Sequence, residues 1–208
     1  MTVSAMEMIN HKEETPFAHY ERLFRQMNPE DAVKGLKDVR WDGEALQVTL
    51  MGCRYRITHP ECVMEALDGG NYQPRLVQIF LMRYLLEGKN LPRLGQWKTF
   101  REMPWGETYT KAFTGRALIR AAVAFGPRLD AFRAACEKMG ATAIDHGDAG
   151  YQFSFIGDYQ MQVLVWEGDE EFQPNAQILF SDNFAEGFPA EDRAVAADLL
   201  INAIRMNM

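Results

Sequence analysis

The spacing of hydrophobic residues changes several times along the chain, and each change predicts a different element. Over residues 17–27 they recur every three or four positions, as on one face of a helix, and residues 30–37 add a short helical turn. Over residues 46–50 and 53–57 hydrophobic and polar residues alternate, as in half-buried strands, and Asp42-Gly43 is a turn signal. The first third of the chain is therefore expected to be helical and then to form a β-meander.

Helical spacing returns in the middle of the chain. Pro74 is expected to begin a helix that Gly88 ends, and two more helices are expected over about 108–124 and 128–139. The first two are separated by residues 89–107, which hold two prolines, two glycines and several large aromatic residues. We expect an ordered loop there, and a loop of that length is more often functional than neutral.

Strand patterns dominate the last third. Residues 151–155 alternate, residues 161–166 are apolar on both faces apart from Gln162, and residues 176–180 form another strand, before Pro189 begins a final helix. The short connections favour antiparallel pairing. We therefore predict an α+β fold: a single domain over 15–208, with a mostly antiparallel sheet from the N-terminal meander and the C-terminal strands, packed with about five helices. Residues 1–14 are expected to be a flexible tail.

Composition excludes several classes of protein. Of the 208 residues, 47% are hydrophobic and 25% are charged, which is typical of a globular domain. The chain lacks an apolar run long enough for a membrane helix, its first residues do not resemble a secretory signal, and its three cysteines form no paired motif. We expect a cytoplasmic protein with free thiols and no membrane partner.

The charge is unevenly distributed along the chain. The net charge of −7 disfavours nucleic acid as a partner. Residues 1–74 carry 8 basic and 12 acidic residues, residues 75–138 carry 12 and 5, and residues 139–208 carry 2 and 12. A single domain must therefore pack a positive centre against a negative C-terminal part, and internal ion pairs are expected between them. An arginine left without such a partner would be the strongest candidate for binding.

The first candidate site lies on the helix expected over 108–124. At 100° per residue, Tyr109, Phe113, Arg116 and Arg120 fall within about 60° of one another. Guanidinium groups beside aromatic rings are typical of a site for a carboxylate or phosphate. Alternatively, these arginines pair with acids of the chain itself.

A second candidate follows the expected central strand. Trp166 ends that strand, and an acidic run containing Asp169 and Glu170 comes after it. Clustered carboxylates can bind a hard cation or hold a proton, although no calcium-type loop is present. The alternatives are a solvated turn and ion pairs to Arg101, Arg116 or Arg120.

A third candidate lies in the loop over 95–106. Arg101 and Glu102 stand between bulky residues such as Trp97, which could hold both side chains rigidly as a site requires. A purely structural clamp explains the pattern equally well. No complete zinc, P-loop, dinucleotide or nucleophile-elbow motif occurs, so we assign no metal ligand, cofactor or catalytic residue.

Several motifs together resemble the bacterial and archaeal family called domain of unknown function 3786, over about residues 17–205. These motifs are Leu81-x-x-Tyr84-Leu85-Leu86, Trp97-x-x-Phe100-Arg101-Glu102-x-Pro104-x-Gly106-x-x-Tyr109, Trp166-x-Gly168-Asp169-Glu170-Glu171-Phe172 and Ile178-Leu179-Phe180-x-Asp182. The resemblance implies a cytoplasmic protein of anaerobic metabolism. Some members carry an N-terminal four-cysteine iron–sulfur module, but this chain has no cysteine before Cys53. The resemblance supplies no reaction.

Three functions follow as hypotheses. The first is a ligand-binding or accessory domain for an anionic small molecule, or a corrinoid- or tetrapyrrole-like ligand. Arginines would hold the ligand between aromatic walls that include Tyr84, Tyr109, Trp97 and Trp166. The second is a structural or partner-binding protein, including a homo-oligomer. The third is a metal-assisted hydrolase that uses Glu102, Asp169 and Glu170.

Overall fold

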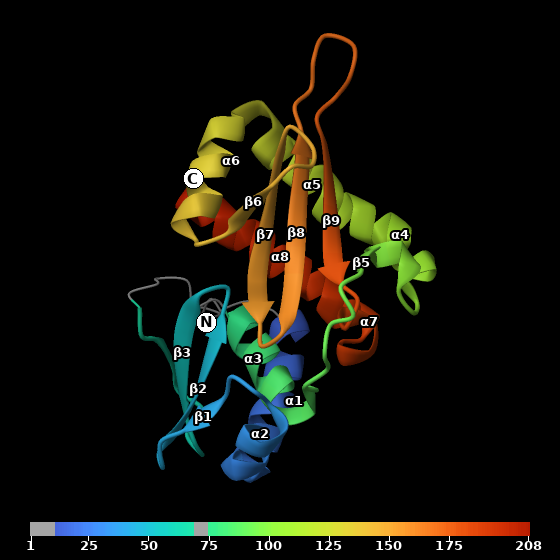
Figure 1. Ribbon diagram of the computed structural model, residues 1–208. Helices are drawn as coiled ribbons and strands as arrows, with labels where there is room; N and C mark the ends of the chain where they lie inside the picture. Colours follow the sequence, from blue (N-terminus) through green and yellow to red (C-terminus); the bar gives the residue numbers. More distant parts are fainter. Residues whose placement is uncertain (1–10, 69–74) are drawn as a thin grey trace, which may run out of the picture.

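The strands pair into one antiparallel sheet that runs through the molecule (Figure 1). Our computed structural model describes residues 11–68 and 75–208, and within them nine strands lie in the order β4-β3-β2-β7-β8-β9-β5, with β1 beside β2 and β6 beside β7. The strands are β1 Arg40–Trp41, β2 Ala45–Leu50, β3 Cys53–Thr58, β4 Met64–Ala66, β5 Trp97–Thr99, β6 Thr142–Ile144, β7 Ala149–Ile156, β8 Tyr159–Trp166 and β9 Asn175–Ser181.

The sheet has two halves that meet at one point. Strands β2 and β7 are paired only at Leu50 and Ile156, so the N-terminal meander and the C-terminal strands form two halves of the sheet that are joined there (Figure 1). Within the meander, Met51 (φ 50°) and Gly52 (φ 78°) connect β2 to β3, and two successive positive φ angles suit a tight hairpin. The predicted meander and antiparallel pairing are confirmed.

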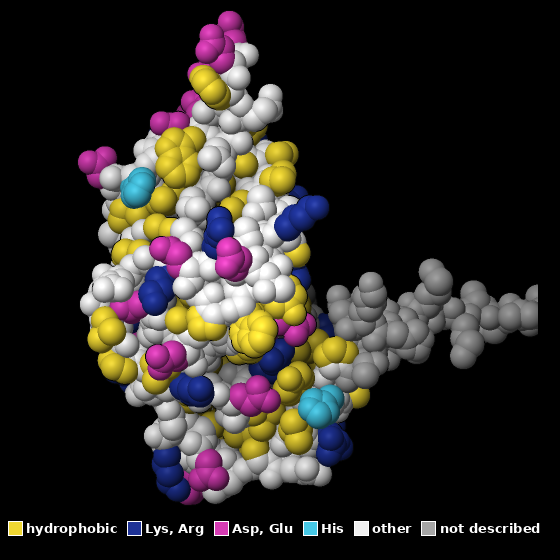
Figure 2. Space-filling view, turned by 90° about the vertical axis from the view of Figure 1, so that its right-hand side faces the viewer, with side chains coloured by type: hydrophobic (Ala, Val, Ile, Leu, Met, Phe, Trp, Pro, Cys, Tyr) yellow, Lys and Arg dark blue, Asp and Glu magenta, His cyan; other side chains and the backbone are white. Residues whose placement is uncertain are grey.

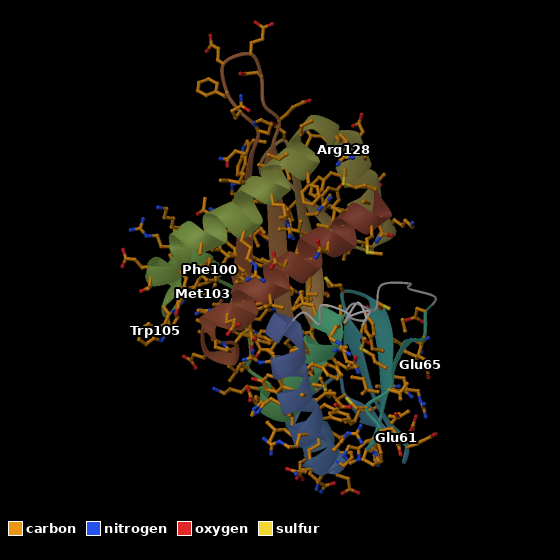
Figure 3. The ribbon with its side chains drawn as sticks, turned by 180° about the vertical axis from the view of Figure 1, so that it is seen from behind. Glu61, Glu65, Phe100, Met103, Trp105 and Arg128 are labelled. Carbon is orange, nitrogen blue, oxygen red and sulfur yellow. The ribbon has the colours of Figure 1, made fainter. Side chains whose placement is uncertain are left out.

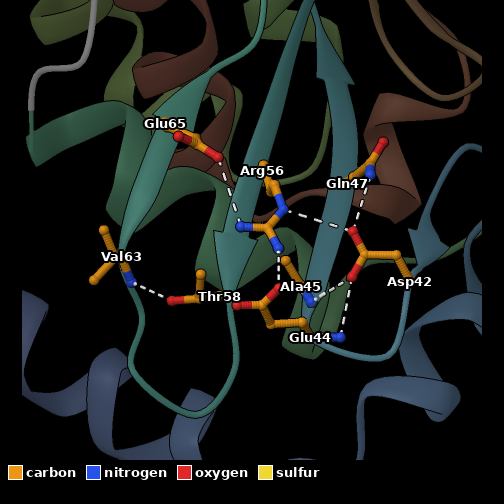
Figure 4. Close-up of polar contacts among 8 residues, drawn as sticks. All are labelled: Asp42, Glu44, Ala45, Gln47, Arg56, Thr58, Val63 and Glu65. Atoms are coloured by element: carbon orange, nitrogen blue, oxygen red, sulfur yellow. Dashed lines mark hydrogen bonds and ion pairs between the residues drawn. The ribbon is translucent and has the colours of Figure 1, made fainter.

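One arginine links three segments of the meander (Figure 4). Arg56 of β3 lies 2.8 Å from Glu44, 3.6 Å from Asp42 and 3.6 Å from Glu65 of β4. Asp42 also accepts hydrogen bonds from the N–H groups of Ala45 and Glu44, and these lower the pKa of its carboxyl to about 2. These contacts therefore join β3, β4 and the turn before β2 on the outer face of the sheet.

The helices pack against the sheet and against one another. They are α1 His11–Gln26, α2 Pro29–Gly35, α3 Arg75–Glu87, α4 Gly106–Phe113, α5 Ile119–Phe125, α6 Leu129–Lys138, α7 Phe184–Gly187 and α8 Ala190–Asn207. The structure confirms the predicted α+β class. No helix among the described residues is long and apolar enough to cross a bilayer.

Helix α8 is the central element of the helical layer. It crosses behind β7, β8 and β9 in Figure 1 and in front of them in the reverse view of Figure 3, and it contacts α3, α4 and α6. Its buried residues include the expected Leu199 and Leu200, whereas Ala194, Val195 and Ala203 are only half-buried. Asp192, Arg193 and Asp198 of this helix are also buried, so charged groups lie inside the core.

Three local predictions need correction. The helix expected over 108–124 is interrupted by a π-helical segment, Thr114–Leu118, whose wider turn shifts the face that later residues occupy. The loop expected over 89–107 contains β5 and a 3₁₀ turn, Phe100–Glu102. Helix α1 begins at His11, inside the expected tail; residues 1–10 and Pro74 lie outside the described residues.

Candidate functional site

The arginines of the first candidate pair with an acid of the chain itself. Arg116 donates from Nε to Asp198 of α8, and Arg120 Nη2 lies 3.3 Å from Asp198 Oδ1. Arg120 also donates to the Asp198 backbone carbonyl. Burial raises the pKa of the Asp198 carboxyl, and the two arginines oppose that rise. This network joins the positive and negative parts of the chain, as expected, but through Asp198 rather than through Asp169 or Glu170.

The third candidate forms local structural contacts. Arg101 makes an exposed ion pair with Glu107 at 3.0 Å. Glu102 accepts hydrogen bonds from the N–H and hydroxyl of Thr99, both at 2.7 Å, which lowers the pKa of its carboxyl and caps the 3₁₀ turn. Trp97 lies in β5, paired with Ser181 of β9. This arrangement matches the structural-clamp interpretation.

The acidic run forms the exposed tip of the β8–β9 hairpin. Asp169 accepts hydrogen bonds from the N–H groups of Glu171 and Phe172, Glu170 is exposed, and Trp166 contacts the ring of His146. The hairpin projects beyond the body of the molecule in Figure 1, and Figure 2 shows acidic side chains at its tip. In the described part of the chain no group of three or more His, Cys, Asp or Glu residues could hold a metal ion.

Two cavities adjoin at Trp105 and Pro189, which line both. The first, of about 450 Å³, lies between α3 and the start of α8 and includes the predicted Tyr84. The second, of about 590 Å³, lies between α4 and α8 and includes the predicted Tyr109, Phe113 and Arg116. Figure 2 faces this side and shows hydrophobic side chains around a hollow that has both acidic and basic groups at its edge. The structure thus brings part of the predicted set together.

Trp105 stands between the cavities in a strained backbone conformation. Its φ angle is 64°, in the left-handed region that bulky residues rarely adopt, and its side chain is 74% exposed. It points outward in Figure 3, whereas Phe100 and Met103 are buried. The next residue, Gly106, packs so closely that a β-carbon there would collide with the Phe100 carbonyl oxygen. Strain of this kind is concentrated at functional sites.

Arg193 is the most unusual charged group of the first cavity. It is only 1% exposed, and its guanidinium lies 5.7 Å from the centre of the Phe100 ring. Nη2 donates to the Pro104 carbonyl, but Nε and Nη1 are buried and have no hydrogen-bond partner within residues 11–68 and 75–208. Burial lowers the pKa of this guanidinium. Within the same residues it forms no ion pair.

Beside it, Asp192 is paired and therefore does not neutralise Arg193. Asp192 Oδ1 lies 2.8 Å from Nη1 of Arg83 in α3, whose guanidinium also lies over the Tyr20 ring. Burial raises the pKa of the Asp192 carboxyl to about 6, against the opposing effect of Arg83. The lining of the first cavity thus includes the ion pair of Asp192 with Arg83 and a buried Arg193 whose Nε and Nη1 have no hydrogen-bond partner in the described part of the chain.

The comparisons with known proteins identify the family. A family model described as domain of unknown function matches residues 28–203. The chain belongs to the domain of unknown function 3786 family. The resemblance seen in the sequence motifs is therefore confirmed, and one of the motif residues, Asp182, is now explained: it accepts hydrogen bonds from the N–H groups of Leu94 and Gln96 and fixes the loop before β5. No curated protein and no solved structure matches this chain.

The sequence patterns did not predict Arg193, Asp192 and Arg83 as residues of the cavity. They also did not distinguish Trp105 from the other aromatic residues of the loop over 89–107. A signal was present for the first two, because Asp192-Arg193 lies in a helix that is otherwise rich in Ala, Leu and Ile. No comparable signal singled out Arg83, since its pairing with Asp192 depends on the packing of α3 against α8.

Proposed function

We propose that this protein is a binding module for a small anionic molecule, whose carboxylate or phosphate group faces Arg193 in the first cavity. The observation that carries the proposal is the buried Arg193 guanidinium, which has two nitrogens without partners among the described residues. Taking a charge out of water costs several kcal/mol unless an opposite charge or full hydrogen bonding compensates it. A bound anion would supply both.

The surroundings favour a small anion. Both cavities are lined by Pro189, which precedes the first turn of α8, and a helix N-terminus carries a partial positive charge. The exposed acids Glu87 and Glu186 also line the first cavity and would repel a large polyanion. Cavities of about 450 and 590 Å³ are in the range that small-molecule sites occupy.

The finer parts of the hypothesis are also proposals. A role in anaerobic metabolism and a cytoplasmic location rest on the family resemblance. A corrinoid- or tetrapyrrole-like ligand would need both cavities and the space above Trp105. The partner-binding alternative is supported by the exposed Trp105 and Tyr109. The hydrolase alternative has less support, because the Glu102 carboxylate caps the 3₁₀ turn and the Asp169 carboxylate accepts N–H groups of its own hairpin tip.

The proposal can be tested with Arg193→Met. Thermal shift and calorimetric titration with propionate, benzoate and inorganic phosphate should show that at least one of them stabilises and binds the wild-type protein. Arg193→Met should lose that response. Without ligand it should be at least as stable as the wild type, since it removes a buried charge that has no acidic partner among residues 11–68 and 75–208.

Arg205→Met is a matched control, because Arg205 is an exposed arginine in the last turn of the same helix. It should bind the anion like the wild type. Arg193→Lys, which keeps the charge but not the guanidinium, should bind more weakly. The proposal is wrong if none of the three anions binds the wild type, or if Arg193→Met binds them unchanged.

A further inference from the structure

We infer that the ligand is a small aromatic carboxylic acid, with its carboxylate at Arg193 and its ring in the second cavity. This inference rests on the proposed function and adds the chemical class of the ligand. It is carried by the aromatic lining of the second cavity and by the way the two cavities adjoin.

The second cavity is lined by two buried, stacked aromatic rings and by two exposed aromatic side chains. The rings of Phe100 and Phe113 are stacked 4.1 Å apart, with an angle of 5° between their planes, and both residues are buried. Trp105 and Tyr109, which also line the cavity, are 74% and 54% exposed. Large rings left in water beside a cavity favour a flat apolar group that would cover them.

The carboxylate and the ring would lie close together. Trp105 and Pro189 line both cavities, and the guanidinium of Arg193 lies 5.7 Å from the ring of Phe100, which lines the second one. A ligand that reaches from Arg193 past Trp105 therefore meets the aromatic lining after a short spacer.

The charges of the site favour a single anionic group. Arg116, the basic residue of the second cavity, already pairs with Asp198, and the exposed Glu191 also lines that cavity. In the first cavity Arg83 is paired with Asp192. Lys89, which also lines the first cavity, donates to the Glu186 backbone carbonyl. A second negative charge on the ligand would meet paired arginines and the exposed carboxylates at both cavities, so a monocarboxylate fits better than a nucleotide or a polyphosphate.

The test compares acids that differ only in the group beyond the carboxylate. The intact protein is titrated calorimetrically with propionate, 3-phenylpropionate and heptanoate. We expect 3-phenylpropionate to bind at least about tenfold more tightly than propionate, as burial of one ring would give after the costs of ordering, and more tightly than heptanoate.

Ala112→Trp fills the second cavity from the exposed rim of α4. It should reduce the advantage of the phenyl group to about twofold or less and leave propionate binding unchanged. The control is Val123→Trp, an apolar exposed position of α5 that does not line this cavity, and it should behave as wild type.

The outcomes separate this inference from the proposed function. Loss of binding of all three acids in Arg193→Met, with equal affinities in the wild type, would overturn the aromatic class and keep the anion site. Equal affinities for heptanoate and 3-phenylpropionate would do the same. Unchanged selectivity in Ala112→Trp would place the ring elsewhere and overturn the inference. If none of these acids binds the wild type but inorganic phosphate does, this inference is wrong and the anion site stays; if neither the acids nor phosphate and benzoate bind, both ideas are wrong.

Discussion

Helix α8 buries charge at two places, and the two places are compensated differently. Near its middle, Asp198 lies against Arg116 and Arg120, both of which reach it from the segment after α4. At its first turn, Arg193 has no acidic partner in the described part of the chain. Asp198 Oδ1 and Arg120 Nε make no hydrogen bond within the described residues, but two cations neutralise Asp198. The same helix therefore carries a neutralised charge and a charge without an acidic partner within two turns.

The difference shows what a buried charge indicates about function. A buried charge that the protein itself neutralises needs no ligand to account for it, because the same fold places its partners. Paired charges are weak evidence for stability, whereas an unpaired one costs free energy that folding alone does not return. We therefore interpret the Asp198 network as structural, and this contrast is the basis for proposing that Arg193 binds an anion.

The largest expected effect comes from removing both arginines that neutralise Asp198. In the double variant Arg116→Met, Arg120→Met, Asp198 keeps its buried carboxylate and loses both cations, so the free energy of unfolding should fall by about 3 to 5 kcal/mol. Urea unfolding followed by circular dichroism measures it. Adding Asp198→Asn should restore most of the loss, since no charge is then left buried.

Arg101→Met is the control for that comparison, because Arg101 forms an exposed pair with Glu107. Exposed pairs contribute less than about 1 kcal/mol, so this variant should unfold like the wild type. Equal losses in Arg101→Met and in the double variant, or no recovery with Asp198→Asn, would show that the Asp198 network is not what holds α8.

A smaller effect is expected from pH, through Asp192. Burial raises the pKa of this carboxyl from 3.8 to about 6, although Arg83 opposes the shift; Glu87 and Glu191 add to it. Above pH 6 the carboxylate is ionised and its burial penalises the fold. As the pH falls from 7 to 4 the folded protein takes up the proton first, and the free energy of unfolding should gain about 2 kcal/mol from this group.

The measurement is a pair of unfolding series at pH 4 to 7, for the wild type and for Asp192→Asn. The variant keeps an acceptor for Arg83 and loses the titration, so the difference between the two curves isolates Asp192 from Asp198, which titrates in both proteins. Parallel curves over this range would mean that Asp192 has an ordinary pKa and that Arg83 fully compensates its burial.

The fold was largely predictable from spacing alone, because each segment has one dominant period. The alternation over 46–57 specified a hairpin whose turn is Met51-Gly52, and the apolar run over 161–166 specified the central strand β8. The π-helical segment Thr114–Leu118 was not predictable, since its apolar residues also fit an ordinary helix. Strand β5 was not predicted for a different reason. It has only three residues, and they pair with β9, far away in the sequence.

The site was predictable only in part, because its residues come together through tertiary packing. The helical spacing correctly associated Tyr109, Phe113 and Arg116, which line one cavity. The partner of Arg116 could not be chosen from sequence, since the C-terminal block offers 12 acids and only the docking of α8 selects Asp198. Arg193 was overlooked because it is one of only two basic residues in that block, where net charge hides a single cation.

The smallest effect comes from the backbone strain at Trp105, which lies beside the first turn of α8. Trp105 has a φ of 64° and an exposed side chain. Its backbone conformation therefore lowers the stability of the fold, and burial of its ring adds little to that stability. Asn tolerates the left-handed conformation better than other residues that carry a β-carbon, whereas Ala does not. Trp105→Asn should therefore be more stable than Trp105→Ala by about 0.5 to 1 kcal/mol in urea unfolding.

Both variants remove the ring, so both should bind 3-phenylpropionate more weakly than the wild type while binding propionate equally well. Equal stabilities for the two variants would show that the turn stores no strain at Trp105, and unchanged phenylpropionate binding would remove that ring from the wall of the site.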